Sequence, residues 1–335
     1  MTAQKKAALL FLTAAVLLAS GCTLPNFQTG GQTSTSSKGL MIQDFHSDFA
    51  RVYPEEELTL NLKMKNMGTF EAGYVHLRLG GLEGWTYKKY VASFDELNKR
   101  RILEPMANEE RCVYKVQEGN GYRSVNLVVR GPSEEFGTEG EEKTCTWTIV
   151  SPKLPNVREV SYIPRLTLYY DYSQATLLSV NLLKRSEMRK LMDTGGEVPS
   201  TTLSTGDSPV SLSLSTKGAV VATSDGTVDF PLEIKVSNRE NGIICFREPG
   251  KEGGCEEPWK YSKVSVVIES PDAQLGGGCT NPISLNLLNS KEGTVVCRLS
   301  TELSEVSAKQ LIVKATAYYR YYIEAETAVT VQKKP

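Results

Sequence analysis

The stretch that decides the fold is ATAYYRYYIEAETAVTV, residues 315–331. Side chains of a β-strand point to alternate faces, and in this stretch the odd positions are mostly apolar or aromatic while the even positions carry the charges. An amphipathic helix would need apolar residues at a period near 3.6, which the stretch does not follow. The pattern predicts a β element with Tyr319 and Tyr321 on its core face and with Tyr318 and Tyr322 on its outer face.

A second stretch of the chain resembles the first. LTLYYDYSQATLLSVNL, residues 166–182, aligns with residues 315–331 without a gap and keeps the same parity. Upstream, ELTLNLKMKNMG (57–68) has a counterpart in DFPLEIKVSNRENG (229–242), and both alternate before an Asn and Gly turn. We therefore expect an all-β protein with two copies of one antiparallel β-sandwich.

The start of the chain has the pattern of an export signal. Lys5 and Lys6 precede an apolar run at 7–19 that only Thr13 interrupts, and small residues precede Cys22. The run is shorter than the roughly 20 residues that a helix needs to cross a bilayer. LASGC resembles the lipobox of prokaryotic lipoproteins, which implies a lipid on Cys22; ordinary signal cleavage nearby is the alternative.

The cysteine count agrees with a lipid on Cys22. Of seven cysteines, six then remain, an even number in a chain exported to an oxidising compartment. Cys145 and Cys297 stand at similar distances before the two tyrosine-rich stretches and look equivalent. The expected disulfides are Cys112 with Cys145, Cys245 with Cys255, and Cys279 with Cys297. A zinc site is the competing interpretation, but the chain has no Cys-x-x-Cys spacing and two histidines far from the cysteines.

Composition divides the chain into segments. The residues after Cys22 are rich in Thr, Ser, Gly and Gln and predict a flexible tether. Between the two copies, SEMRKLMDTGG predicts a short helix with an apolar stripe, which packs on a sandwich or docks a partner. We expect a signal peptide at 1–21, a lipid-anchored flexible tether at 22–39, a first immunoglobulin-like β-sandwich at 40–184, a linker with the helix at 185–207, and a second sandwich at 208–335.

One part of the first copy resembles a known family. VYPEEELTLNLKMKNMGTFEAGYVHLRL, residues 52–79, is similar to the start of immunoglobulin-like domains called cell-adhesion-related, which are common in exported bacterial and archaeal proteins. Pro54 precedes an alternating strand, Asn66 and Gly68 form the turn, and a second strand follows at 74–79. The resemblance implies an antiparallel sandwich with a scaffolding or adhesive role and no active site.

The sequence offers little catalytic chemistry. It has no Gly-x-Ser-x-Gly elbow, and two histidines leave little from which to build a Ser-His-Asp triad. We expect no catalytic residue, no cofactor and no metal, although SEEFGTEGEEK (133–143) is either a solvated loop or a calcium loop. Paired acids of a glycoside hydrolase are invisible in a sequence. A formal net charge of -1 provides no basic footprint for nucleic acid.

These observations predict a non-catalytic extracytoplasmic lipoprotein, an adhesive, structural or partner-binding module of the cell envelope. Its partners would be the membrane, through the lipid, and an envelope or cell-surface protein or glycan. An accessory subunit of a pilus, secretion or envelope assembly is one alternative, and an exported carbohydrate-binding protein or hydrolase is another.

The candidate partner face consists of Tyr318, Arg320 and Tyr322. Parity directs all three outward, and exposed Tyr and Arg are enriched where proteins bind partners. The alternative is that neighbouring segments cover these side chains and that they belong to the packing of the fold.

Overall fold

The structure is a computed structural model of the chain. It describes residues 38–93, 114–118, 121–125, 127–133, 135–196, 201–216, 220–251, 255, 260–303 and 307–334. The predictions for the signal peptide, for lipidation at Cys22, for most of the tether and for Cys112 lie outside these residues.

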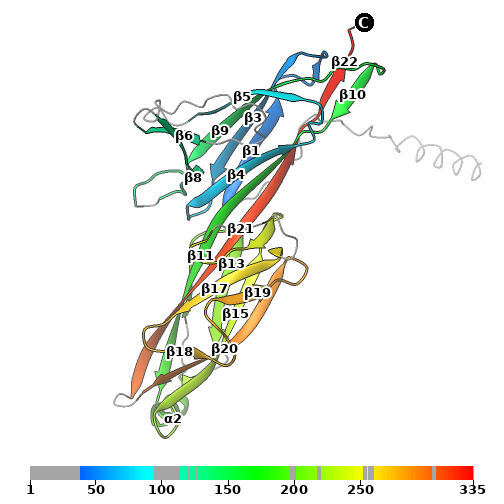
Figure 1. Ribbon diagram of the computed structural model, residues 1–335. Helices are drawn as coiled ribbons and strands as arrows, with labels where there is room; N and C mark the ends of the chain where they lie inside the picture. Colours follow the sequence, from blue (N-terminus) through cyan, green and yellow to red (C-terminus); the bar gives the residue numbers. More distant parts are fainter. Residues whose placement is uncertain are drawn as a thin grey trace, which may run out of the picture. The chain divides into compact units, whose positions relative to one another are not determined.

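The predicted all-β class is confirmed. The described chain is built of mostly antiparallel strands with one helix, α2 (Arg185–Asp193), which lies where the sequence predicts it (Figure 1). No described helix is long and apolar enough to cross a membrane.

Each copy contributes a four-stranded sheet. In the first, the order is β1 (Leu40–Ser47), β3 (Glu57–Asn66), β9 (Glu142–Val150) and β5 (Thr86–Ser93). In the second, the order is β13 (Val210–Thr216), β15 (Thr227–Asn238), β20 (Glu292–Glu302) and β18 (Gln274–Gly276).

A nine-stranded sheet serves both copies. Its path is β19 (Ile283–Asn286), β17 (Lys263–Glu269), β21 (Ala308–Glu326), β11 (Arg165–Leu183), β4 (Ala72–Gly80) and β8 (Leu127–Val129). Three further strands attach to its centre, namely β12 (Thr201–Thr205) and β14 (Val220–Val221) on β11, and β16 (Ile243–Phe246) on β21. The remaining strands form two small sheets, one with β10 (Glu159–Tyr162), β22 (Val329–Gln332) and β2 (Arg51–Val52), the other with β6 (Tyr114–Glu118) and β7 (Gly121–Val125).

The two longest strands join the sandwiches. β11 and β21 pair over 19 residues each, and Figure 1 shows them side by side from the strands of one sandwich to those of the other. At one end of this shared ladder β11 borders β4, and nearer its middle β21 borders β17 through residues 314–318. The described residues of both sandwiches accordingly belong to one compact unit.

This arrangement corrects the expected boundaries at 184 and 208. β22, near the end of the chain, pairs with β2 and β10 from the first copy. β12, inside the predicted linker, is a strand of the shared sheet. The predicted separation fails because strand pairing is long-range, and a parity pattern does not say which strand lies beside which.

The parity prediction itself is confirmed by four tyrosines of the ladder. Tyr170 faces Tyr321, Tyr172 faces Tyr319, and all four are at most 1% exposed. Their ring centroids lie 5.8–6.3 Å apart around a closed circuit, with tilted or edge-to-face rings. We call this set the tyrosine quartet.

Two hydroxyls of the quartet explain the Asn and Gly turns of the repeat. The Tyr172 hydroxyl accepts the backbone N–H of Phe70 at 3.0 Å, and the Tyr321 hydroxyl accepts that of Gly242 at 2.9 Å. A Cβ at Gly68 would collide with Tyr172, and a Cβ at Gly242 would collide with Tyr321. Glycine is therefore needed where a quartet ring packs against the turn.

A buried asparagine stabilises each of these turns. The Asn66 side-chain amide donates to the carbonyls of Phe70 and Val129, both at 2.8 Å. The Asn238 amide donates to the carbonyls of Gly242 and Ser290, at 2.9 and 3.3 Å. These bonds satisfy backbone groups where β3 and β15 end.

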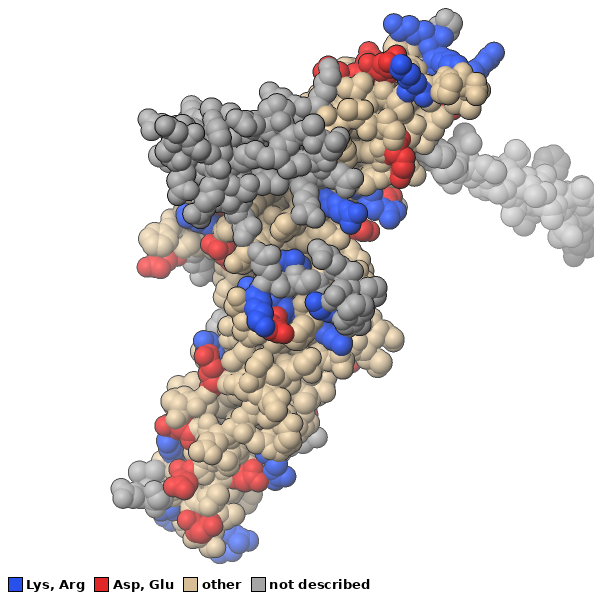
Figure 2. All heavy atoms as spheres, in the orientation of Figure 1, with Lys and Arg blue, Asp and Glu red and all other residues tan. Residues whose placement is uncertain are grey.

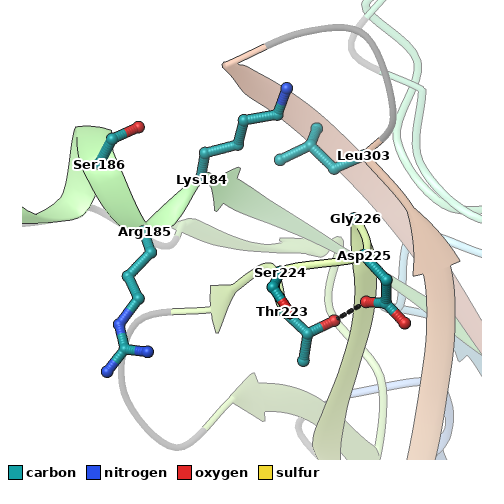
Figure 3. Close-up of a pocket in the computed structure, with 8 residues that line it drawn as sticks. All are labelled: Lys184, Arg185, Ser186, Thr223, Ser224, Asp225, Gly226 and Leu303. Atoms are coloured by element: carbon teal, nitrogen blue, oxygen red, sulfur yellow. Dashed lines mark hydrogen bonds between the residues drawn. The ribbon is translucent and has the colours of Figure 1, made fainter.

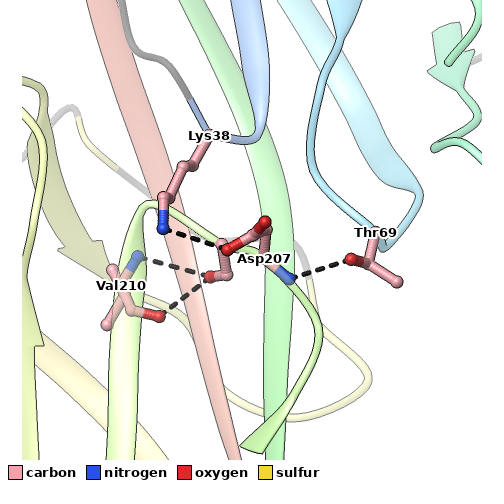
Figure 4. Close-up of polar contacts among 5 residues, drawn as sticks. Lys38, Thr69, Asp207 and Val210 are labelled. Atoms are coloured by element: carbon pink, nitrogen blue, oxygen red, sulfur yellow. Dashed lines mark hydrogen bonds and ion pairs between the residues drawn. The ribbon is translucent and has the colours of Figure 1, made fainter.

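The segments that lead into the two sandwiches meet beside the quartet (Figure 4). Lys38, before β1, forms an ion pair of 3.0 Å with Asp207, before β13. The backbone N–H of Asp207 donates to the Thr69 hydroxyl at 2.8 Å, and Ser208 contacts the Tyr319 hydroxyl at 2.6 Å. The two copies are thus joined by loops as well as by the ladder.

The disulfides follow the prediction within the described residues. Cys245 is bonded to Cys255, and Cys279 to Cys297. Cys145 is also disulfide-bonded, and its predicted partner Cys112 lies in a segment that the structure does not describe. Disulfides indicate an oxidising, extracytoplasmic compartment.

The expected equivalence of Cys145 and Cys297 is wrong by two positions. Cys145 faces Leu62 of β3, whereas Cys297 faces Leu232 of β15. Leu232 corresponds to Leu60 when the two copies are aligned on Asn66 and Asn238 of their turns. Distance along the sequence to the tyrosine-rich strand is a weaker guide than the register of the neighbouring strand.

Candidate functional site

The candidate site is the outer face of the shared ladder where the two sandwiches meet. Residues of opposite parity to the quartet point to this face. They include Tyr169 and Asp171 of β11, and Tyr318, Arg320 and Tyr322 of β21. Asp171 faces Arg320 in the ladder, and Tyr169 faces Tyr322.

Three charged side chains form a buried cluster at the centre. Arg320 Nε donates to Asp171 Oδ1 at 2.6 Å, and Arg247 Nε lies 3.1 Å from Asp171 Oδ2. The Asp171 side chain is 1% exposed, and those of Arg320 and Arg247 are 10% and 15% exposed. The prediction that Arg320 is an exposed contact residue is therefore wrong.

A segment of the second copy covers this charged cluster. Arg247 follows β16, which adds a strand beside β21 and places Cys245 next to Arg320. The disulfide between Cys245 and Cys255 closes this segment, and Arg247 also donates to the Lys251 carbonyl at 3.0 Å. An outward-pointing charge becomes buried because an insertion of the second copy lies over it.

The cluster holds two guanidinium groups against one carboxylate. Such groups lose their hydration on burial, and hydrogen-bonded partners must compensate the loss. Arg320 Nη2 is buried and has no hydrogen bond to any residue that the structure describes. Asp171 is thus the central acceptor, and the arrangement is more sensitive to its loss than an exposed ion pair would be.

Tyrosines surround the cluster. The Tyr322 ring lies 5.4 Å from that of Tyr169 and 6.2 Å from that of Tyr261, and all three are half-buried, as is Tyr318. The pKa of Tyr322 is raised to about 12, mainly by burial and to a smaller extent by charge interactions with Tyr261 and Glu324. Its hydroxyl is therefore protonated at neutral pH and available as a hydrogen-bond donor.

The glutamate-rich loop carries its own counter-ions. A hydrogen bond and charge interaction with Lys65 lower the pKa of Glu139. The pairs are Glu139 with Lys65 at 2.6 Å, Glu141 with Lys143 at 2.5 Å, and Glu142 with Lys63 at 3.0 Å. Within the described ranges, no group of three or more His, Cys, Asp or Glu side chains is placed to hold a metal ion.

Three surface hollows of the described chain are lined mainly by polar and charged residues. The hollow in Figure 3, about 340 Å³, is lined by Lys184, Arg185 and the turn at 223–226, where the Thr223 hydroxyl donates to Asp225 and lowers the pKa of that carboxyl. Figure 3 shows Lys184 and Arg185 pointing to opposite sides.

Two further hollows are polar in a similar way. One of about 410 Å³ includes Arg78, Glu83 and Trp85, and one of about 560 Å³ includes Asp272 and Lys309. No histidine or cysteine lines any of these three hollows.

Charges of both signs are interspersed over the surface. Figure 2 shows lysine and arginine side chains next to aspartate and glutamate side chains on the face in view. Ion pairs also join neighbouring strands of the described chain, such as Arg165 with Glu326 and Lys314 with Glu269. The described residues in this view form no continuous basic stripe of the kind that binds nucleic acid.

Comparison with known proteins assigns no family. No family model matches the sequence, and no curated protein matches it either. A red sea bream transglutaminase structure is 8% identical with a TM-score of 0.17, over 88% of this chain and 31% of that chain, so this chain spans less than a third of its length. A collagen adhesin from S. aureus is 9% identical with a TM-score of 0.14, over 89% and 94% of the two chains. These scores are too low to support an argument about fold or function.

Proposed function

We propose that the protein is a non-catalytic, extracytoplasmic module of the cell envelope, held at the membrane by a lipid on Cys22, with an adhesive, structural or partner-binding role. The shared ladder supports this most: two strands of 19 residues run through both sandwiches, so one sandwich cannot turn without breaking ladder hydrogen bonds. Such a body suits a part that holds a partner at a fixed place. A subunit of a pilus, secretion or envelope assembly would use the same property.

The outer tyrosine face is the proposed contact surface. Tyr169, Tyr261, Tyr318 and Tyr322 are half-buried, so each ring is held in place and keeps an exposed part. Rigid tyrosines lose little conformational entropy on binding and offer a hydroxyl together with an apolar ring. The buried arginines beneath them position the rings and do not contact the partner.

Lipidation is tested on the protein purified from membranes. Mass spectrometry of the mature N-terminus should find a lipid on Cys22, and Cys22→Ser should move the protein to the soluble fraction, because the anchor is then lost. Thr23→Ser, one residue further, is the matched control and should remain in the membrane. An unmodified Cys22 or an uncleaved Met1 would rule out the anchor.

The contact surface is tested by a double change, Tyr318→Ser with Tyr322→Ser. Mild crosslinking of the membrane-bound protein, then purification and mass spectrometry, should recover a partner with the wild type and not with this variant. The melting temperature should fall by only a few degrees, because the rings are half-buried and the quartet is untouched.

Ile312→Ser is the matched control, on the same face of β21 and 54% exposed. It should leave crosslinking unchanged. A partner still recovered with the double variant, well below its melting temperature, would assign Tyr318 and Tyr322 to packing alone.

A further inference from the structure

Asp171 and Arg320 occupy a special position in the shared ladder. In the sequence repeat, Tyr170 corresponds to Tyr319 and Tyr172 to Tyr321. In the ladder the partners are exchanged, so that Tyr170 faces Tyr321 and Tyr172 faces Tyr319. Asp171 both corresponds to Arg320 and faces it. The local twofold axis that relates β11 to β21 therefore passes between these two residues.

We infer that this pair makes the two halves of one chain pair with each other, and prevents either half from pairing with the same half of a second chain. The inference concerns assembly and is independent of the proposed envelope function.

The buried residues of the ladder do not favour pairing within one chain over pairing between two copies. If β11 paired with β11 of a second copy about the same axis, Tyr170 would face Tyr172 of that copy, and four tyrosines would again form a quartet. If β21 paired with itself, Tyr319 would face Tyr321 in the same way. The parity of both strands is preserved in each case, so apolar burial is similar.

The axis residues do distinguish the pairings. In a ladder of two β11 strands, Asp171 would face Asp171, and in a ladder of two β21 strands, Arg320 would face Arg320. Like charges directly opposite each other destabilise a strand pair. Between two β21 strands the arginines would also be buried, because β16 lies beside β21. Only the observed pairing brings opposite charges together, with the 2.6 Å hydrogen bond between Arg320 and Asp171.

The main test removes both charges. Asp171→Leu with Arg320→Leu removes the facing pair and leaves only Arg247, which is partly exposed, without its carboxylate, so the chain should fold. Correct and incorrect pairings then become similar. The protein is unfolded with its disulfides intact and refolded at two protein concentrations, about 0.3 mM and about 3 µM. The higher one is near the effective concentration that one half of the chain experiences from the other half to which it is linked. Light scattering after gel filtration then measures the dimer fraction.

We expect wild type to refold almost entirely as monomer at both concentrations. The double variant should give roughly a third or more dimer at the higher concentration, because association competes with intramolecular pairing there. The matched control is Arg165→Leu with Glu326→Leu, a facing ion pair of the same ladder that lies away from the axis. In a ladder of two β11 strands Arg165 would face Leu177, so this control should behave like wild type.

A crosslink identifies which pairing the dimer uses. In Asp171→Cys with Arg320→Leu, a ladder of two β11 strands places the new cysteine opposite its own copy, at a Cα separation of about 4.5–5.5 Å that a disulfide can span. A non-reducing gel should show a covalent dimer, and Arg165→Cys with Glu326→Leu should show none.

Monomer alone at both concentrations, with a free thiol at position 171, would overturn the inference. If the leucine variant fails to fold, Asp171→Asn with Arg320→Gln serves as the neutral pair with the same readouts, and monomer alone would again overturn it.

Discussion

Asp171→Ala is expected to lower the free energy of unfolding by about 3–5 kcal/mol, because it leaves two buried guanidinium groups without their carboxylate. The melting temperature should fall on the order of 5–10 °C, measured by circular dichroism or calorimetry. Asp171 accepts a hydrogen bond from Arg320 and forms an ion pair with Arg247, so its removal takes the carboxylate from both arginines at once.

The control for this prediction is the double change Asp171→Leu with Arg320→Leu. Removing one partner of a buried ion pair is costly, whereas replacing both partners by apolar residues is often neutral. The double variant leaves only the Arg247 guanidinium without its carboxylate, whereas Asp171→Ala leaves two. The double variant should therefore melt several degrees above Asp171→Ala. Equal melting temperatures for wild type and Asp171→Ala would show that the cluster contributes nothing to stability.

Alkaline pH is expected to unfold the protein cooperatively. An unfolded tyrosine has a pKa of about 10. Burial is the main cause that raises the pKa of all four quartet tyrosines well above this value in the folded state. Their contribution is fully present below pH 10 and is lost above it, because the unfolded chain then releases protons that the folded chain retains.

The size of this effect is large. Above pH 10, each buried tyrosine should shift the equilibrium toward the unfolded state about tenfold per pH unit. The four tyrosines together should shift it by roughly 10⁴ per pH unit. Tyrosinate absorbance and circular dichroism should change together, in one transition.

Tyr170→Phe keeps the ring, removes one ionisable hydroxyl, and should reduce the pH dependence by about a factor of ten per unit. Smooth titration of all tyrosines near pH 10 with the fold intact would contradict this account of the quartet.

The sequence predicts the local pattern of the fold well. Alternation alone places Tyr170, Tyr172, Tyr319 and Tyr321 inward, since a buried face must be apolar at every second residue. The repeat identifies equivalent strands, and the spacing within a short loop indicates the bond between Cys245 and Cys255. Each of these predictions depends on residues that are close in sequence or related by a gapless alignment.

Long-range pairing accounts for what the sequence leaves open. β11 and β21 lie far apart in the chain, and nothing in either stretch states that they share one ladder. Parity gives the direction of Arg320 but not its burial, which depends on Arg247 and on the segment closed by Cys245 and Cys255. β12 is missed because its polar TTLST sequence is typical of a linker, whereas its backbone pairs with β11.

The central claim is that both sandwiches fold as one body because they share β11 and β21. Native-state hydrogen exchange with mass spectrometry, in increasing low concentrations of denaturant, tests it most directly. Peptides from β3 and β9 of the first copy should reach the same opening free energy, with the same denaturant dependence, as peptides from β15 and β20 of the second. Opening of one sandwich at a clearly lower free energy, while the other stays protected, would contradict it.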